Sequence, residues 1–275
     1  MRTLHTALPL VVLSHFVIDA QQKSRDRSIA EMVRSSLEAV VLIEMFDSSG
    51  NRIRQGSGFL LSPDGQIATN YHVIEGASSG QVKLNNGASF PIAGVVAARK
   101  NDDIAVLKVL GNNLPYLPLA DASNVSVGDR VMAIGSPLGL QNSVSDGVVS
   151  AFRVSERGTS LIQTSAPISP GNSGGPLLNL DGAVAGILTF KWRGGENLNF
   201  AVASSALHSL LAGPHTTSPA TPLTLLDTIE SESPSTVSAP APSRPCPVPF
   251  VLATMGWDDP RQVKWEWFTT DAVYW

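Results

Sequence analysis

The chain has 275 residues, of which 15% are charged, and its formal net charge is −4 at pH 7. This length suits one large or two small domains with a substantial hydrophobic core. The slight negative charge argues against a polyanionic partner, so we expect no binding of nucleic acid. The single cysteine, Cys246, excludes a framework of internal disulfides.

The first segment of the chain has the pattern of a secretory signal peptide. Arg2 precedes an apolar run from Ala7 to Ile18, and Ala20 ends this run before a polar stretch. A basic start, an apolar centre and a small residue at the end are typical of such signals. We therefore expect residues 1–20 to be a signal peptide that directs the protein out of the cytoplasm, to the periplasm or the medium. An uncleaved N-terminal membrane anchor is the alternative.

Residues 21–213 have the pattern of one folded domain. The stretch 25–38 predicts a short amphipathic helix, and 204–213 predicts a closing helix that ends at Gly213. Between them, short apolar runs alternate with turn signals such as "PDGQ", "NNGA" and "NLDGA". Many short strands separated by Asp-Gly and Asn-Gly turns indicate an all-β barrel or sandwich.

Two segments of different composition follow this domain. Residues 214–249 contain nine of the nineteen prolines among Ser, Thr and Ala, which predicts a disordered linker. Residues 250–275 contain four of the five tryptophans but are too short for a core of their own. For this tail, docking to a partner and an appendage without a role both stay open.

The stretch "SPGNSGGPLLN" (169–179) surrounds Ser173 with three glycines and two prolines. Because glycine permits backbone conformations closed to other residues, such a turn can present Ser173 as a nucleophile beside bare N–H groups. A hairpin corner without catalytic meaning is the alternative. A serine hydroxyl attacks only if a base accepts its proton, and a third group must orient that base.

Only one histidine lies in the predicted β region. This is His72, at the end of the strand-like run in "ATNYHVIEG". The other four lie in the predicted signal, on the closing helix or in the linker; they are His5, His15, His208 and His215. Elimination therefore makes His72 the candidate base.

The candidate orienting acid is one of two adjacent aspartates. Asp102 and Asp103 directly precede the apolar run "IAVLKVL". A carboxylate beside a buried strand needs a hydrogen-bond donor, and a histidine N–H is a suitable one. Asp103 is the first candidate because it adjoins the strand. Asp102 is the second candidate, and a solvated turn residue is its alternative role.

The motif "GNSGG" also fits G-x-S-x-G, the nucleophile turn of α/β-hydrolases. That fold requires the chain order Ser, acid, His and a helix directly after the serine. Here His72 precedes Ser173, and Pro176 stands three residues after the serine at the start of a predicted β-hairpin. The α/β-hydrolase interpretation is therefore rejected.

Five sequence blocks in order resemble the protease domain of the HtrA/Deg trypsin-like serine endopeptidases, over about residues 28–210. They are "GSGFLLSPDGQIATNYHVIEGA", "DDIAVLKV", "GSPLGLQNSVSDGVVSAF", "QTSAPISPGNSGGPLLNLDGAVAGI" and "LNFAV". The resemblance implies an all-β, trypsin-like fold of two six-stranded β-barrels with short flanking helices. It places His72 and Asp103 in the first barrel and Ser173 in the second.

The resemblance also implies a role for each site residue. Ser173 would attack the scissile carbonyl, with His72 as general base and then acid and Asp103 orienting the imidazole. The backbone N–H groups of Gly171 and Ser173 would bind the oxyanion. Asn172 replaces the aspartate that a new N-terminus neutralises in digestive enzymes, so we expect no activation of that kind. We expect no metal and no cofactor.

The resemblance also places the pocket for the P1 side chain of the substrate. The residues expected to bind substrate there are Pro167, Leu188, Thr189, Phe190 and Asn199. None of them is a carboxylate that could pair with Lys or Arg. We therefore expect a preference for small or medium aliphatic P1 residues.

The sequence departs from the family pattern after the protease domain. Sixty-two residues follow Gly213, which is too few for the linker and a PDZ domain together. The family assembles as trimers through N-terminal segments, so a homotrimer built on residues 21–38 is an expectation by analogy.

The predicted function is a serine endopeptidase that cleaves unfolded or damaged proteins. The alternative is a protease-fold binding or chaperone-like module whose site is idle.

Overall fold

The computed structural model describes residues 29–121, 124–136, 143–191, 199–213 and 221–225. The predicted signal peptide and the tryptophan-rich tail lie outside these ranges, as does most of the predicted linker. In the described part of the chain, no helix is long and apolar enough to span a membrane. The description below concerns the folded unit within residues 1–232.

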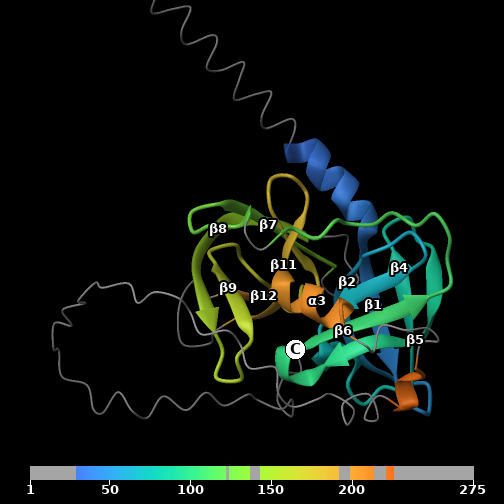
Figure 1. Ribbon diagram of the computed structural model, residues 1–275. Coiled ribbons are helices and arrows are strands. Elements are labelled where there is room, and N and C mark those ends of the chain that lie inside the picture. Colours follow the sequence, from blue (N-terminus) through green and yellow to red (C-terminus); the bar gives the residue numbers. More distant parts are fainter. Residues whose placement is uncertain (1–28, 122–123, 137–142, 192–198, 214–220, 226–275) are drawn as a thin grey trace, which may run out of the picture. The chain divides into compact units, whose positions relative to one another are not determined.

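Two closed antiparallel β-barrels form the fold, and each contains six strands (Figure 1). The first has the strand order β1-β2-β3-β6-β5-β4, and the second has the order β10-β11-β12-β9-β8-β7. Each barrel is continuous in sequence, which is why the strand runs fall into two consecutive groups. The prediction of a trypsin-like double barrel is therefore confirmed.

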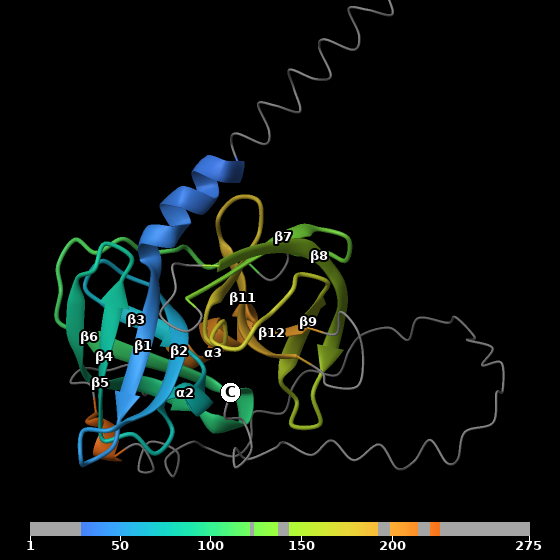
Figure 2. The same ribbon diagram turned by 180° about the vertical axis from the view of Figure 1, so that it is seen from behind.

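The strands of the first barrel are β1 (Val40–Phe46), β2 (Arg52–Leu60), β3 (Gln66–Thr69), β4 (Ser79–Leu84), β5 (Ser89–Arg99) and β6 (Ile104–Val109). A short helix, α2 (Tyr71–Ile74), follows β3, and a 3-10 turn, η1 (Lys100–Asp102), connects β5 to β6. Side chains such as Phe59, Ile67 and Leu107 are fully buried and fill this barrel. Figure 2 shows α2 on the side of the first barrel that faces the second barrel.

The strands of the second barrel are β7 (Arg130–Gly135), β8 (Ser143–Val154), β9 (Ser160–Thr164), β10 (Pro176–Leu178), β11 (Val184–Lys191) and β12 (Asn199–Ala203). Its own hydrophobic cluster includes Val131, Ile162 and Leu188. Strand β11 continues to Lys191. Residues 192–198 lie outside the described ranges.

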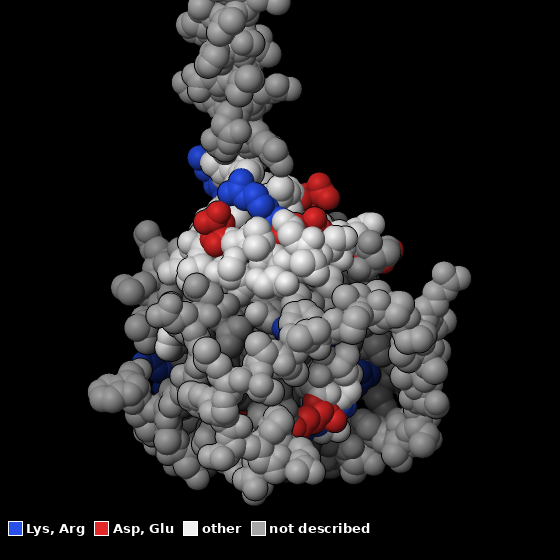
Figure 3. All heavy atoms as spheres, turned by 90° about the vertical axis from the view of Figure 1, so that its left-hand side faces the viewer, with Lys and Arg blue, Asp and Glu red and all other residues white. Residues whose placement is uncertain are grey.

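Helices cover the barrels near both ends of the described chain. The first helix, over residues 29–39, turns partly buried apolar side chains, including Met32 and Val33, toward the core. This agrees with the predicted amphipathic helix. Acidic and basic side chains lie next to one another on its outer surface, at the top of Figure 3. The closing helix, α3 (Ser204–Leu211), follows β12 and buries Leu207 and Leu210 in the cluster that contains the core of the first barrel.

Part of the predicted linker is ordered. Thr221 and Val95 of β5 exchange two backbone hydrogen bonds, with N···O distances of 2.7 and 2.8 Å. The short turn η4 (Leu223–Leu225) follows, and Leu223 is buried. The apolar side chain of Leu223 explains the difference, since it buries surface in the cluster that contains the core of the first barrel. The folded unit therefore extends beyond Gly213.

Candidate active site

His72 and Asp103 form a closely bonded pair in the first barrel. The ring Nδ1 of His72 lies 2.8 Å from Oδ2 and 3.0 Å from Oδ1 of Asp103. The backbone N–H of His72 also donates to Oδ1, at 3.0 Å. A carboxylate at Nδ1 favours the tautomer that carries its hydrogen there, which leaves Nε2 free to accept a proton. The pair can thus operate as an oriented base.

Asp103 owes its place to a left-handed turn. Its backbone has φ 53° and ψ 43°, and it caps the 3-10 turn η1 by donating its N–H to the carbonyl of Lys100, at 3.0 Å. The side-chain amide of Asn70, one residue before α2, donates to the carbonyl of Asp103 at 2.9 Å. This contact links the ends of β3 and η1. The fold thereby brings together His72 and Asp103, which lie 31 positions apart in the sequence.

The environment of His72 raises the pKa of its imidazole above the ordinary value. Burial alone would lower the pKa, because it disfavours the charged form. The charge and the hydrogen bond of Asp103 outweigh this effect. More distant charges oppose one another, since Arg54 lowers the pKa and Glu75 raises it. The site therefore stabilises the imidazolium that would form when His72 accepts a proton.

Ser173 belongs to the same hydrogen-bond network through Thr189 of β11. The hydroxyl of Thr189 donates to Oδ2 of Asp103 at 2.7 Å, and its backbone carbonyl accepts from Oγ of Ser173 at 3.0 Å. Within the described ranges, Oγ makes no hydrogen bond to the ring of His72. Such contacts are often longer in free enzymes and tighten when substrate binds. A hydrogen-bond network that includes Thr189 thus links His72, Asp103 and Ser173.

The loop around Ser173 leaves two N–H groups unused. The N–H groups of Asn172, Gly174 and Gly175 donate to the carbonyls of Ser169, Leu188 and Asn172, respectively. Those of Gly171 and Ser173 donate to no other described residue. Gly171 has φ 94°, a conformation that glycine adopts without strain. The two N–H groups are those expected to bind an oxyanion.

Ser57 of β2 anchors this loop from the first barrel. Its backbone N–H donates to the carbonyl of Ser173 at 2.8 Å, and its hydroxyl donates to the carbonyl of Gly171 at 2.6 Å. The hydroxyl also accepts from the N–H of Ser136, at the end of β7, at 2.8 Å. Ser57 is fully buried, and its hydroxyl uses these two hydrogen bonds to hold the loop in place.

Gly174 and Gly175, which follow the serine, permit close packing of this loop against both barrels. A Cβ atom at Gly174 would lie 2.1 Å from the carbonyl oxygen of Ser57, and one at Gly175 would lie 2.1 Å from that of Ile134. Both contacts are with backbone, which cannot move away as a flexible side chain can. Any larger residue would therefore push the loop away from the first or the second barrel.

The residues expected to bind the P1 side chain have different environments. Pro167 is exposed, whereas Leu188, Thr189 and Asn199 are buried. Asn199 faces Lys191 in the strand register, and neither side-chain polar atom of Asn199 has a hydrogen-bond partner among the described residues. The hydroxyl of Thr189 donates to Oδ2 of Asp103. The side chain of Phe190 is not described.

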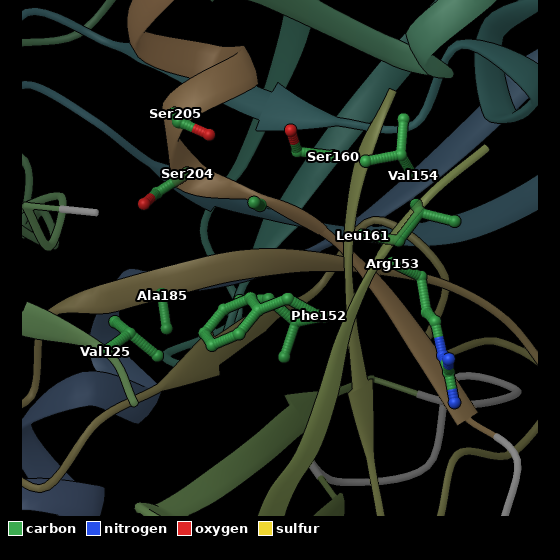
Figure 4. Close-up of a pocket in the computed structure, with 11 residues that line it drawn as sticks. Val125, Phe152, Arg153, Val154, Ser160, Leu161, Ala185, Ser204 and Ser205 are labelled. Atoms are coloured by element: carbon green, nitrogen blue, oxygen red, sulfur yellow. The ribbon is translucent and has the colours of Figure 1, made fainter. Parts of the chain in front are cut away.

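A separate apolar cavity of about 280 Å³ lies on the second barrel and contains none of the predicted site residues. Figure 4 shows it between Phe152 and Leu161 of the β8–β9 pair and the first residues of α3, Ser204 and Ser205. No cluster of His, Cys, Asp or Glu suited to a metal ion occurs within the described ranges.

Sequence reasoning missed Ser57 and the hydrogen-bonding role of Thr189. Ser57 lies in the block "GSGFLLS", where its two flanking glycines gave a signal of close packing. A Cβ at Gly56 would meet Val73 at 2.7 Å and the carbonyl of Ser173 at 3.3 Å. For Thr189 the sequence holds no local signal, because its partner Asp103 is 86 positions away.

Comparisons with known proteins agree with this geometry. Residues 56–187 match the family described as "Trypsin-like peptidase domain". A "Probable periplasmic serine endoprotease DegP-like" from Halomonas elongata is 51% identical over 142 residues, which are 50% of this chain and 30% of that protein. "Serine protease HTRA1A" from Danio rerio is 40% identical over 197 residues, which are 67% of this chain and 40% of that protein.

A solved structure is similar as well. The "HtrA-type protease AlgW with tripeptide" superposes with a TM-score of 0.61 at 32% identity, covering 66% of this chain and 62% of that one. The chain spans less than half the length of the curated relatives named above. The double barrel, the matched residues and these relatives together show that the chain belongs to the HtrA/Deg family of trypsin-like serine proteases.

Proposed function

We propose that this chain is a serine endopeptidase in which Ser173 is the nucleophile, His72 the general base and Asp103 the orienting acid. One observation carries the proposal. The His72–Asp103 pair shares a hydrogen-bond network with Ser173, and two N–H groups beside Ser173 donate to no described residue. Nucleophilic acyl transfer needs these parts together: an oriented base, a hydroxyl and an oxyanion site.

The chemistry begins with a rotation of the Ser173 hydroxyl. In the free protein, Oγ donates to the carbonyl of Thr189. Turning it toward Nε2 of His72 lets the imidazole remove its proton as Oγ attacks the scissile carbonyl. The carboxylate of Asp103 then stabilises the imidazolium. His72 returns the proton to the leaving amine, and water repeats the sequence to release the acyl group.

The negative oxygen of the tetrahedral intermediate is assigned to the N–H groups of Gly171 and Ser173. Each preorganised donor of this kind contributes about 3 kcal/mol to transition-state stabilisation. Ser57 supports the arrangement, because its hydroxyl holds the carbonyl of Gly171 and its N–H holds that of Ser173. With both carbonyls held by the first barrel, the backbone from Gly171 to Ser173 is restrained at both ends, and the N–H of Ser173 lies between the two fixed carbonyls.

We further propose that the substrates are unfolded or damaged proteins outside the cytoplasm, with small or aliphatic P1 residues. Support comes from relatives named periplasmic serine endoproteases and from the absence of a carboxylate among the five predicted pocket residues. The signal peptide over residues 1–20, the homotrimer and the docking of the tail remain proposals. N-terminal sequencing of the exported protein tests the signal peptide, and light scattering tests the homotrimer. A peptide library that varies the P1 residue tests the pocket.

The central experiment compares wild type with Ser173→Ala. A fluorophosphonate probe should label wild type alone, and only wild type should digest unfolded casein. Asn172 leaves no carboxylate for a new N-terminus to neutralise, so we expect labelling without prior cleavage. A folded wild-type protein that is neither labelled nor active on casein would favour the idle binding module. Equal labelling of both proteins would show that another residue reacts.

A further inference from the structure

The turn that precedes Asp103 is held by a residue outside the proposed catalytic group, namely Asp102. Its carboxylate accepts one hydrogen bond from the guanidinium of Arg99, at 2.8 Å, and another from the hydroxyl of Thr159, at 2.7 Å. Its side chain is only 13% exposed. The sequence left Asp102 as a second candidate for the orienting acid or as a solvated turn residue, and this geometry fits neither role.

Thr159 belongs to the opposite barrel. It follows the turn of the β8–β9 hairpin, where its N–H donates to Oγ of Ser155 and its carbonyl accepts from the N–H of Ser155. Its hydroxyl also lies 3.1 Å from the carbonyl of Asn101, and the residue is buried. Figures 1 and 2 both show the tip of this hairpin beside the turn between β5 and β6. The contact therefore joins the two barrels next to Asp103.

The same turn is fastened to the helix that carries His72. Nζ of Lys100 lies 2.7 Å from a carboxylate oxygen of Glu75, the residue that caps α2. It also lies 5.4 Å from the ring centre of Tyr71, the first residue of α2. The three residues of η1 thus connect α2 on one side with the β8–β9 hairpin on the other.

The conformation of Asp103 explains why such fastening matters. A residue other than glycine in the left-handed region is strained and persists where its surroundings over-determine it. Asn70 and Lys100 hold the backbone of Asp103 from within the first barrel. The hydroxyl of Thr159 adds side-chain contacts that reach η1 from the second barrel, to the carboxylate of Asp102 and to the carbonyl of Asn101.

We propose that Asp102 and Thr159 are positioning residues, through which the β8–β9 hairpin fixes the turn that aims Asp103 at His72. This inference rests on the proposed function, because it assigns the two residues to the same reaction. Both residues would act through the turn and not on the reacting atoms themselves. Without their hydrogen bond, the turn can relax away from its left-handed geometry, and the Asp103 carboxylate then loses its alignment with Nδ1 of His72.

The test removes the hydroxyl of Thr159 with a substitution that keeps the shape of the side chain. Thr159→Val should lower kcat about 10- to 100-fold with little change in KM, since a small misalignment of a catalytic group has effects of this size. Thr159→Ser retains the hydroxyl and should restore most of the activity. Asp102→Ala removes the acceptor and should lower kcat as well, and the double variant should be no less active than the more impaired single variant, because both changes remove the hydrogen bond between Thr159 and Asp102.

A second measurement follows His72 directly and requires no turnover. In an NMR titration of the histidine ring, Thr159→Val and Asp102→Ala should lower the pKa of His72. The charged groups that act on this ring are Asp103, Glu75 and Arg54, and Lys100 is paired with Glu75. Asp102 is itself an acid, so its replacement tests charge and contact together, whereas Thr159→Val tests the contact alone.

Ser160→Ala is the matched control, because it removes an exposed hydroxyl from the same hairpin. It should keep the wild-type kcat and His72 pKa. Unchanged kcat and unchanged His72 pKa in both Thr159→Val and Asp102→Ala would overturn the inference, as would a loss confined to KM. If Thr159→Val does not fold, the result for Asp102→Ala decides between these outcomes. Wild type that resists the fluorophosphonate probe contradicts the proposed function, and the NMR titration still tests the positioning.

Discussion

Oγ of Ser173 lies 3.0 Å from the backbone carbonyl oxygen of Thr189 and donates its hydrogen bond to it. The hydroxyl of the same threonine donates to the carboxylate of Asp103. Thr189 therefore contacts the candidate nucleophile with its main chain and the candidate acid with its side chain. A buried residue of β11 thus joins two groups that come from different barrels.

Removing the Thr189 hydroxyl should impair the reaction. In Thr189→Val, Oδ2 of Asp103 loses a donor while the carbonyl that accepts from Ser173 remains. Hydrogen bonds to charged groups contribute about 1.5–3 kcal/mol, so kcat/KM should fall about 10- to 100-fold. Thr189→Ser retains the donor and is the control. The rate of fluorophosphonate labelling measures the effect, and equal rates for wild type and Thr189→Val would contradict it.

The pH dependence of the reaction should reflect the raised pKa of His72. Only the neutral imidazole accepts a proton, so kcat/KM should rise with pH as His72 deprotonates. The midpoint should lie above the ordinary histidine value of about 6.5.

The free energy of unfolding should depend on pH in the opposite direction, decreasing as pH rises. The His72–Asp103 ion pair contributes fully below the unfolded-state pKa, and its contribution is lost as pH rises through the folded-state pKa.

Asp103→Asn tests the cause of this shift. Without the carboxylate charge, the midpoint of kcat/KM should move to lower pH, because burial then lowers the His72 pKa without opposition from Asp103. The amide can also favour the wrong tautomer, so kcat should fall by about 10⁴-fold. Asp181→Asn, at an exposed turn, is the control. A pH profile of Asp103→Asn that overlays the wild-type profile would rule out this cause.

Ser57→Ala should reduce activity more than it reduces folding. The change leaves the carbonyl of Gly171 and the N–H of Ser136 without their buried partner. We expect a loss of stability of about 1–3 kcal/mol, since unsatisfied buried groups cost this much. The freed peptide between residues 171 and 172 should also lower kcat about tenfold or more.

Thermal unfolding and steady-state kinetics separate the two effects of Ser57→Ala. Ser89→Ala, at an exposed position of the same barrel, should match wild type in both. A Ser57→Ala protein with wild-type kcat would show that the hydroxyl does not hold the loop in its productive form.

Gly174→Ala should damage the site by overlap. The new Cβ would lie 2.1 Å from the carbonyl oxygen of Ser57, at a residue with φ +87°. The left-handed conformation alone costs about 1–3 kcal/mol, and the overlap adds to it. Gly50→Ala separates the two terms, because Gly50 has φ +81° and open space around its Cβ position. Gly50→Ala should lose stability but remain active, and equal activity of both variants would refute the overlap.

Local patterns in the sequence are sufficient for the all-β fold class and for the choice of His72 and Ser173, and they narrow the orienting acid to two adjacent aspartates. Short apolar runs between Gly-containing turns identify strands, because each strand buries its own side chains and each turn has its own backbone requirements. The histidine was found by elimination, and the serine by the glycines around it. These signals need no knowledge of which strands pair.

Only the tertiary structure decided between Asp102 and Asp103. It alone also identified Ser57 as a residue that holds the loop of Ser173, and Thr189 and Thr159 as hydrogen-bond partners of the two aspartates. The contact of Thr159 with Asp102 joins residues 57 positions apart, and that of Ser57 with Gly171 joins residues 114 apart. Such contacts form when two closed barrels pack together, and no local propensity specifies them. For the same reason the sequence could not show that the Ser173 hydroxyl is bonded to the Thr189 carbonyl in the free protein.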